Sequence, residues 1–372
     1  MKKQVVIAMG LAVLSTGAYA SKARLQALGQ DANGSQYLDD SRNVLLNPAH
    51  LNYHKDFVTM EFGDTANGTD QNSSPRAEGG MFKASGNMVY GLYFGAENDT
   101  ANLVDAGVDF DPNTVGVQTT GETNNTDFFV AGDAGVQWGA RLSYHSFKDK
   151  QATADVKSDL TTLRVGVISG DTEGFLKFGL TNKAEDGTNE MKGKSDMDLG
   201  ITHAVGDIDY MIRYISNEFE NAAGSKNKTQ NTHVGAARSY KLNDKASAWA
   251  SAWYMMDKDD NEYGTVGEVK STKLPVSIGI EVMAKDWLTL RGSVGQNIIG
   301  TTENDAGDEK TIADSTSVAA GASLTFGDLS VDGMISNDAD GNGAAQSDNT
   351  ASGNGTLRTD ALMSRVSMTY KF

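Results

Sequence analysis

The sequence has 372 residues, no cysteine and a formal net charge of −17 at neutral pH. The lack of cysteine excludes disulfides and thiolate chemistry, and the acidic balance argues against nucleic acid as a partner. Beyond Leu14 no apolar run is long enough for a membrane-spanning helix, so a helical membrane protein is excluded. A chain with 41 glycines and only 4 prolines leaves two classes, an exported soluble β protein and a membrane barrel.

Residues 1–20 have the three parts of a secretory signal peptide. Lys2 and Lys3 form a charged start, an apolar run covers residues 5–14, and Ala18-Tyr19-Ala20 is a small-x-small cleavage site. The run is too short to cross a bilayer as a helix. We therefore expect the mature chain to begin at Ser21, and loss of the two lysines changes the formal charge from −17 to −19.

Residues 21–55 show no alternation of apolar and polar side chains and form a separate region. Ala23, Leu25 and Leu28 fit one side of a short helix, and Gly29 is a stop signal for it.

The same region carries a short motif, Asn47-Pro48-Ala49, followed by an aliphatic residue after one more position. Upstream lie Ala-Leu-Gly at 27–29, an acidic pair at 39–40 and Asn-Val at 43–44. Together these features resemble the N-terminal hatch of the long-chain fatty-acid transporter family of outer-membrane barrels. The resemblance covers about a tenth of the chain, as a motif match. It implies a hatch inside a barrel; a cap on the periplasmic end of the barrel is the alternative.

From Phe57 onward the side chains alternate with a period of two, which predicts β-strands with one apolar and one polar face. Trp138, Leu142 and Tyr144, for example, oppose Arg141 within one strand. Alternation is weaker, and the facing is open, around residues 79–84, 127–131, 246–255 and 329–335. Counting predicts an all-β fold over residues 56–372, a transmembrane antiparallel β-barrel of about sixteen strands. A barrel of about fourteen strands, the number of the fatty-acid transporter family, is the alternative if two weak strands are loops.

Short and long connections alternate along the chain, which is typical of outer-membrane barrels with short periplasmic turns and long external loops. The short ones carry the Gly, Asp or Asn that tight hairpins need. Tight turns are predicted at 85–86, 132–135, 170–171, 206–207, 243–244, 285–286 and 327–328. Longer polar links are predicted at 97–126, 148–155, 217–228, 257–269, 301–312 and 337–359.

The last strand places Val366, Met368, Tyr370 and the terminal Phe372 on one face. This pattern resembles the closing strand of the bacterial outer-membrane barrels. In that family the strand closes the barrel and is read by the barrel assembly machinery. The resemblance implies the cell outer membrane as location and outer-membrane lipid as surroundings, and leaves a homotrimer open as the assembly.

The polar face of the strands predicts the lining of the lumen. Its charged members lean toward basic residues, which suits a channel for small hydrophilic solutes. The predicted pore-lining residues are Arg141, Arg164, Lys177, Asp198, Asp209, Arg213, Lys273, Glu281, Arg291 and Arg365. We therefore predict a porin; mutual ion pairing that fills the barrel without conduction is a second interpretation of the same charges.

Two rival functions remain at this point. One is a transporter of hydrophobic compounds like the fatty-acid transporters, although a charged lumen fits that function poorly. The other is a structural or adhesive surface barrel that displays acidic loops. An enzyme is not expected, although His145 and His233 point into the lumen with Ser and Asp neighbours.

Two connections carry further hypotheses. Residues 97–126 contain apolar side chains and could fold inward as a constriction, or stand above the membrane. Asp338, Asp340 and Asn342 match the start of a calcium loop, but Asn349 stands where such a loop needs Glu. Weak calcium binding is the most that this loop predicts; no other cofactor is expected.

Overall fold

The computed structural model describes residues 21–63, 77–96, 125–150, 155–186, 189–262, 267–311, 316–336 and 363–372. The signal peptide, the calcium-loop residues and nearly all of the predicted inward loop lie outside these ranges, so their predictions stay predictions. The strands are β1 (Phe57–Phe62), β2 (Glu78–Ser85), β3 (Met88–Phe94), β4 (Thr126–Asp133), β5 (Gln137–Lys150), β6 (Asp155–Ser169), β7 (Thr172–Asp186), β8 (Asn189–Val205), β9 (Ile208–Asn221), β10 (Lys226–Asn243), β11 (Ala246–Asn261), β12 (Gly267–Lys285), β13 (Leu288–Asn304), β14 (Glu309–Thr311), β15 (Thr316–Phe326), β16 (Leu329–Ser336) and β17 (Met363–Lys371).

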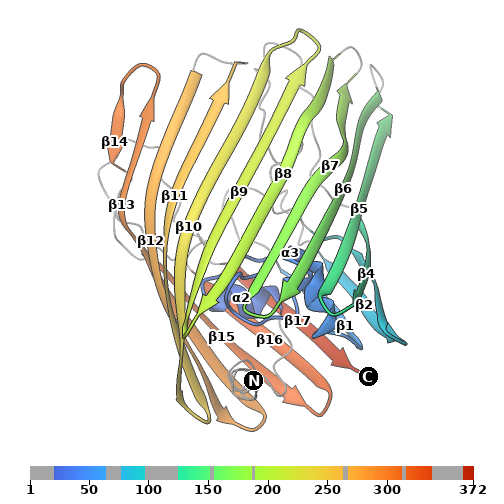
Figure 1. Ribbon diagram of the computed structural model, residues 1–372, viewed down its shortest axis with the longest axis vertical. Coiled ribbons are helices and arrows are strands. Elements are labelled where there is room, and N and C mark those ends of the chain that lie inside the picture. The colour runs from blue at the N-terminus through green and yellow to red at the C-terminus, as the bar shows by residue number, and fades with distance from the viewer. Residues whose placement is uncertain are drawn as a thin grey trace.

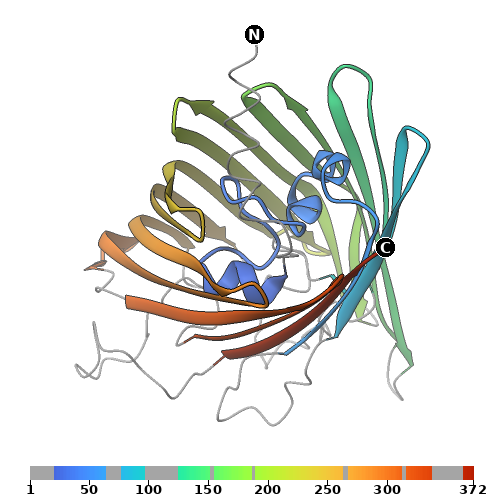
Figure 2. The ribbon, with the colours of Figure 1, turned by 90° about the horizontal axis from the view of Figure 1, so that it is seen from below.

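Each strand pairs antiparallel with its neighbours in chain order, and the sheet closes where β1 pairs with both β2 and β17. Thr59 stands opposite Thr369 in this closing pair. Both β14 and β15 pair with β13, so they are two pieces of one strand, and the described residues form a closed barrel of sixteen strands. The predicted fold class is confirmed, with sixteen strands rather than fourteen. Figure 2 shows the ring from below.

Tight turns join the strands at one end of the barrel, at the places that the sequence predicts. Gly86, Gly170, Gly206 and Gly327 each have φ close to +60°, a left-handed conformation that glycine adopts without steric cost. Three turns lie one residue later than predicted, at residues 86–87, 244–245 and 286–287, and the turn predicted at 132–135 lies at 134–136. The chain also ends on this side, where the backbone N–H of Phe372 donates to the carbonyl of Asp56.

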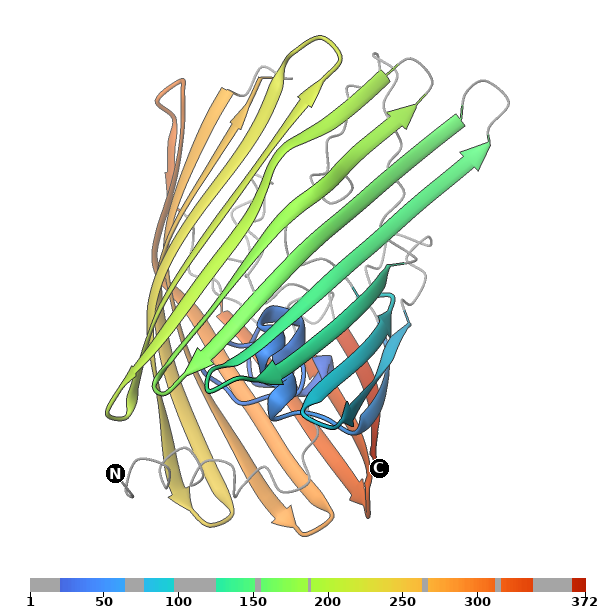
Figure 3. The ribbon, with the colours of Figure 1, turned by 45° about the vertical axis from the view of Figure 1, so that its right-hand side comes forward.

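The barrel wall is tall on one side and low on the other (Figures 1 and 3). Strands β5 to β13 have 14 to 19 residues, whereas β1 to β4 have 6 to 8. The predicted links at 217–228, 257–269 and 301–312 are wrong in their length, because the flanking strands continue through most of them. Both faces of these extensions are polar, so no apolar alternation marks them as strands. Exposed cross-strand ion pairs occur there instead, such as Lys226 Nζ to Glu218 Oε1 at 2.8 Å.

The outer surface carries the apolar parity of the strands, and the inner surface carries the polar one. Ile278 is 58 % exposed, while Ser143 on an inner face is 5 % exposed. Aromatic side chains gather on the outer surface near the turns, among them Tyr210, Tyr240 and Trp287. An apolar belt with an aromatic border is the surface of a transmembrane barrel. Within the described ranges, no helix has the length and apolarity needed to cross a membrane.

Residues 21–55 lie inside the ring, in its lower half, and are called the plug below (Figures 1 and 2). The plug contains α2 (Lys22–Ala27), α3 (Asn43–Leu46) and the 3-10 helix η1 (Pro48–Asn52). Ser21 caps α2 by accepting a hydrogen bond from the backbone N–H of Arg24. Gly29 follows the helix with φ of +68°, in agreement with the predicted stop.

Candidate functional site

The plug is attached to the barrel by buried charges. Arg42 donates from one guanidinium nitrogen to Glu61 on β1 and Glu78 on β2, both at 2.6 Å, and to the hydroxyl of Tyr93 on β3 at 3.0 Å. Burial opposes the charged form, but the two carboxylates raise the pKa of Arg42 well above its ordinary value. Lys22 adds a second cation, with Nζ 3.1 Å from Glu78. One cationic cluster of the plug therefore holds the low side of the wall.

A second cluster holds the opposite side of the plug. Arg24 pairs with Glu281 on β12 at 3.0 Å and with Asp40 of the plug at 2.8 Å. Glu281 also pairs with Arg291 on β13 at 2.9 Å, and Arg291 continues to Asp332 on β16 at 2.8 Å. Burial raises the pKa of Asp40 to about 6, although Arg24 opposes this shift. The charges thus form one continuous chain from the plug into three strands.

Two wall arginines bind the plug backbone. Arg141 on β5 donates to the carbonyl of Leu45 at 3.0 Å, and Arg164 on β6 donates to the carbonyl of Leu46 at 3.1 Å. Both carbonyls lie at the end of α3, where the last carbonyls of a helix lack partners within the helix. Carboxylates on the wall fix the two guanidinium groups. Asp127 accepts from Arg141, and Asp198 accepts from Arg164, each at 2.9 Å.

The motif Asn47-Pro48-Ala49 lies against two glycines of the wall. Gly139 on β5 and Gly166 on β6 are paired directly across the two strands. A Cβ at Gly139 would overlap the backbone of Pro48, and a Cβ at Gly166 would overlap the amide of Asn47. The two glycines therefore create the space into which the plug backbone fits, and we call them the glycine pair. Asn47 also caps η1 by accepting from the backbone N–H of Ala49 at 3.1 Å.

The predicted pore-lining residues lie on the inner face, but most of them are used to hold the plug or one another. Arg141, Arg164, Lys177, Asp198 and Arg291 are at most 5 % exposed. The basic excess that the sequence suggests is compensated by inner acids that the sequence analysis missed. These acids are Glu61, Glu78, Asp127, Asp196 and Asp332. Several of them lie in or beside the strands with weak alternation, where parity gave no reliable facing.

Four predicted lining residues have other surroundings. Lys273 on β12 lines a cavity beside the plug, as does Arg213, which also pairs with Asp198 at 2.9 Å. Asp209 lies next to a tight turn on β9, and Arg365 lies on β17; both are partly exposed.

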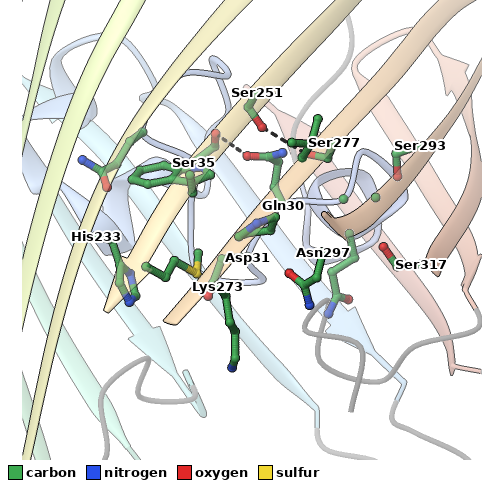
Figure 4. A pocket seen from close by; sticks show the side chains of 18 of the residues that line it. Gln30, Asp31, Ser35, His233, Ser251, Lys273, Ser277, Ser293, Asn297 and Ser317 are labelled. Atoms are coloured by element: carbon green, nitrogen blue, oxygen red, sulfur yellow. Dashed lines mark hydrogen bonds between the residues drawn. The ribbon is translucent and has the colours of Figure 1, made fainter. Parts of the chain in front are cut away.

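A polar cavity of about 370 Å³ separates the plug from the tall wall (Figure 4). On the wall side, strands β9 to β13, β15 and β16 contribute hydroxyl and amide groups, including Ser277, Ser293, Asn297 and Ser317, beside apolar side chains such as Met255 and Val276. On the plug side lie Gln26, Gln30, Asp31, Ser35 and Tyr37. Ser251 and Ser277 share a hydrogen bond of 2.9 Å across β11 and β12. The lining therefore combines neutral donors and acceptors with apolar surface and with the ionisable side chains of Asp31, Arg213, His233, Asp257 and Lys273.

The edges of the cavity combine one histidine–aspartate contact with aromatic rings. His233 Nε2 lies 2.8 Å from Asp257 Oδ1 on the side away from the turns. The hydroxyl of Tyr37 lies 3.1 Å from Ser251 Oγ, and the Tyr37 ring is tilted against Trp249 with centroids 5.7 Å apart. Burial raises the pKa of Tyr37 to about 12, so its hydroxyl is neutral at physiological pH.

The histidines that face the lumen do not form a catalytic triad among the described residues. His233 is hydrogen-bonded to Asp257, whereas Ser251 on β11 is hydrogen-bonded to Ser277 and Tyr37. Buried His145 has no hydrogen-bond partner at either ring nitrogen within these residues. His50 and His54, which the sequence analysis left without a role, lie together at the base of the plug with Asp39.

Comparison of the sequence with protein-family models and with curated proteins found no match. Among solved structures the chain is similar to the outer-membrane-expressed OmpT of Vibrio cholerae, with 10% identity and a TM-score of 0.41 over 85% of this chain and 97% of that one. It is also similar to a Pseudomonas aeruginosa FadL homologue (11% identity, 95% and 99% covered, TM-score 0.41) and to a porin (13%, 86% and 99%, 0.42). At these TM-scores no residue role is carried over. The hatch resemblance of Asn47-Pro48-Ala49 stays a prediction.

Proposed function

We propose that the protein is an outer-membrane channel that admits small hydrophilic solutes by passive diffusion, with the plug restricting the passage. The observation that carries the proposal is the polar cavity between plug and wall. Hydroxyl and amide groups replace the hydration shell of an uncharged polar solute, and a cavity of about 370 Å³ suits a small molecule. The tight turns then face the periplasm and the long strands face outward, as in other barrels of this class.

The rival functions have less support. A transporter of hydrophobic compounds needs a largely apolar lining, whereas in this cavity the apolar side chains alternate with polar ones and with Asp31, His233, Asp257 and Lys273. A display barrel needs no cavity at all. We do not propose an enzymatic activity.

Solute flux through the refolded full chain tests the proposal. In liposomes we expect swelling with small neutral polar solutes that slows as solute size increases, and in planar bilayers a small single-channel conductance. Ser277→Trp should reduce the flux, because Ser277 lines the cavity. Ile278→Trp is the matched control, since the next side chain along the strand is 58 % exposed on the outer surface.

Flux that Ser277→Trp leaves unchanged would place the passage elsewhere. Binding of an apolar probe without polar flux would favour the hydrophobic-transporter alternative. In both experiments heat-dependent gel mobility reports whether the variant has folded.

A further inference from the structure

Three ligand-type side chains converge at the base of the plug. One ligand atom each from Asp39, His50 and His54 lies within 4.8 Å of the other two. His54 Nε2 and Asp39 Oδ1 are already in hydrogen-bond contact, 2.9 Å apart. The two histidines are brought together by one turn of helix, since the backbone N–H of His54 donates to the carbonyl of His50 at 2.9 Å. Their rings are stacked, 22° from parallel.

The wall supplies a fourth group that fixes one imidazole. His50 Nε2 lies 2.7 Å from Glu173 Oε2 on β7, at the tight turn between β6 and β7. When Nε2 carries the proton and donates it to Glu173, the lone pair of His50 is on Nδ1. This nitrogen is buried and has no hydrogen-bond partner among the described residues. A carboxylate that orients a histidine through one nitrogen, leaving the other for a metal, is the usual outer shell of a metal site.

We propose that Asp39, His50 and His54 bind a divalent transition-metal ion, with Zn²⁺ as the expected ion and Glu173 as the residue that positions His50. Two imidazoles and one carboxylate are a donor set that zinc accepts, with water in the fourth position. The donor set is a poor one for calcium or magnesium, which prefer oxygen ligands throughout.

The geometry needs little change to hold the ion. Bond lengths of about 2.0–2.2 Å in a tetrahedral site place neighbouring ligand atoms roughly 3.3 Å apart, and the present separations are at most 4.8 Å. The Asp39 side chain is 52 % exposed, which leaves a path for the ion, while those of His50 and His54 are 13 % and 18 % exposed. A metal here would join the segment around Asp39 to η1, two parts of the plug that the chain connects only through α3.

The test is metal binding by the full chain, refolded in detergent, purified without a histidine tag and treated with a chelator. Zn²⁺ is titrated in competition with a chromophoric chelator, and Co²⁺ serves as the spectroscopic probe of coordination. We expect one ion per chain and a Co²⁺ spectrum of tetrahedral intensity. His50→Ala and His54→Ala should each weaken binding at least about 100-fold, and Glu173→Gln about 10-fold with the stoichiometry unchanged.

His203→Ala is the matched control. His203 lies beside the same turns but faces outward, is exposed, and bonds to Thr172 Oγ1 at 2.8 Å, next to Glu173. Asp39→Asn keeps the shape of an exposed side chain, so it tests the site without a risk to folding, and gel mobility checks every variant. The proposal is overturned if the wild-type chain binds no Zn²⁺, if binding survives His54→Ala and Asp39→Asn, or if His203→Ala weakens it equally.

Discussion

The glycine pair of the wall, Gly139 and Gly166, offers a direct way to separate the plug from the barrel. Replacing either by alanine adds one methyl group in the space that Asn47-Pro48-Ala49 occupies. Both residues lie in strands, where alanine is tolerated by the backbone, so the wall itself should close as before. Because the added atoms overlap the plug and not a neighbouring strand, the substitution should weaken the docking of the plug and leave the strand pairing unchanged.

The expected magnitude follows from what each methyl group meets. Inserting a methyl group into a packed interior costs about 1–3 kcal/mol. At Gly166 it also disturbs Asn47, whose cap on η1 is worth about 1 kcal/mol, so Gly166→Ala should cost about 2–4 kcal/mol of docking free energy. At Gly139 the overlap is with the backbone of Pro48, which cannot rotate aside. A loss of about 3 kcal/mol raises the undocked population by roughly 100-fold, since about 1.4 kcal/mol is tenfold.

A single cysteine reports this population, because the natural chain contains none. Ala23→Cys places the thiol in α2, at a fully buried position away from the glycine pair. Its labelling rate by a maleimide should rise roughly 100-fold in the Gly139→Ala and Gly166→Ala backgrounds. Gly333→Ala is the control, since a Cβ at Gly333 on β16 would meet nothing within 4 Å. Equal labelling in all three backgrounds would refute the argument that the glycine pair receives the plug.

Substitutions of charged residues, and of residues on the inner and outer faces of the wall, should change the free energy of unfolding in different ways. Arg42→Gln should lower the free energy of unfolding by about 3–5 kcal/mol, because it removes the cation that two buried carboxylates share and leaves Glu78 with Lys22 alone. Lys226→Gln should change it by less than about 1 kcal/mol, because its partner lies with it in water. Ile278→Arg should cost about 2–4 kcal/mol near the middle of the apolar belt, whereas the cavity should accept Ser277→Arg within about 1 kcal/mol. Denaturant unfolding in lipid vesicles, followed by tryptophan fluorescence, measures all four variants.

Salt separates the two charge effects. The Lys226 variant should become indistinguishable from wild type at 1 M salt, where the screening length falls to about 3 Å, close to the 2.8 Å separation of this pair. The effect of Arg42→Gln should persist. Similar losses for Arg42 and Lys226 would mean that the plug cluster is hydrated rather than buried, and equal costs for Ile278→Arg and Ser277→Arg would contradict the assignment of inner and outer faces.

The parity of side chains was sufficient to predict the barrel, its closing strand and its turns. In a bilayer every second residue of a strand must be apolar, because it contacts lipid. The alternation in the sequence therefore predicts that Leu142 and Ile278 face outward. Glycine and aspartate mark the turns because few other residues accept the left-handed conformation. Strand length could not be predicted in the same way. Beyond the apolar belt both faces of a strand are polar, as in the region of Lys226, so strand and loop have the same composition.

The inner site could be predicted only in part. The alternation in the sequence places Arg141 and Arg164 on the inner face. Their partners, however, come from other strands and from the plug. Contacts between segments that lie far apart in the chain leave no local pattern in the sequence. Asp127 is an example, because the strand that carries it has apolar residues on both faces and no clear parity. Parity puts both members of the glycine pair on the inner face, but one sequence cannot show that they receive the plug, because a strand glycine does not reveal what packs against it.

For the channel function proposed above, the chemistry of the plug makes it the element best suited to control passage. Sixteen strands are held by a continuous backbone ladder, which cannot open locally in lipid without exposing unpaired polar groups. The plug is held by ion pairs such as Arg42–Glu61 and Arg24–Glu281. A buried pair gains little net free energy, since the attraction mainly offsets the cost of removing both charges from water. When the plug leaves, water hydrates the same charges, and this hydration free energy offsets much of the lost attraction between them. Release of the plug therefore costs far less than opening of the wall, and we expect solute flux to follow the docking equilibrium that Gly139→Ala shifts.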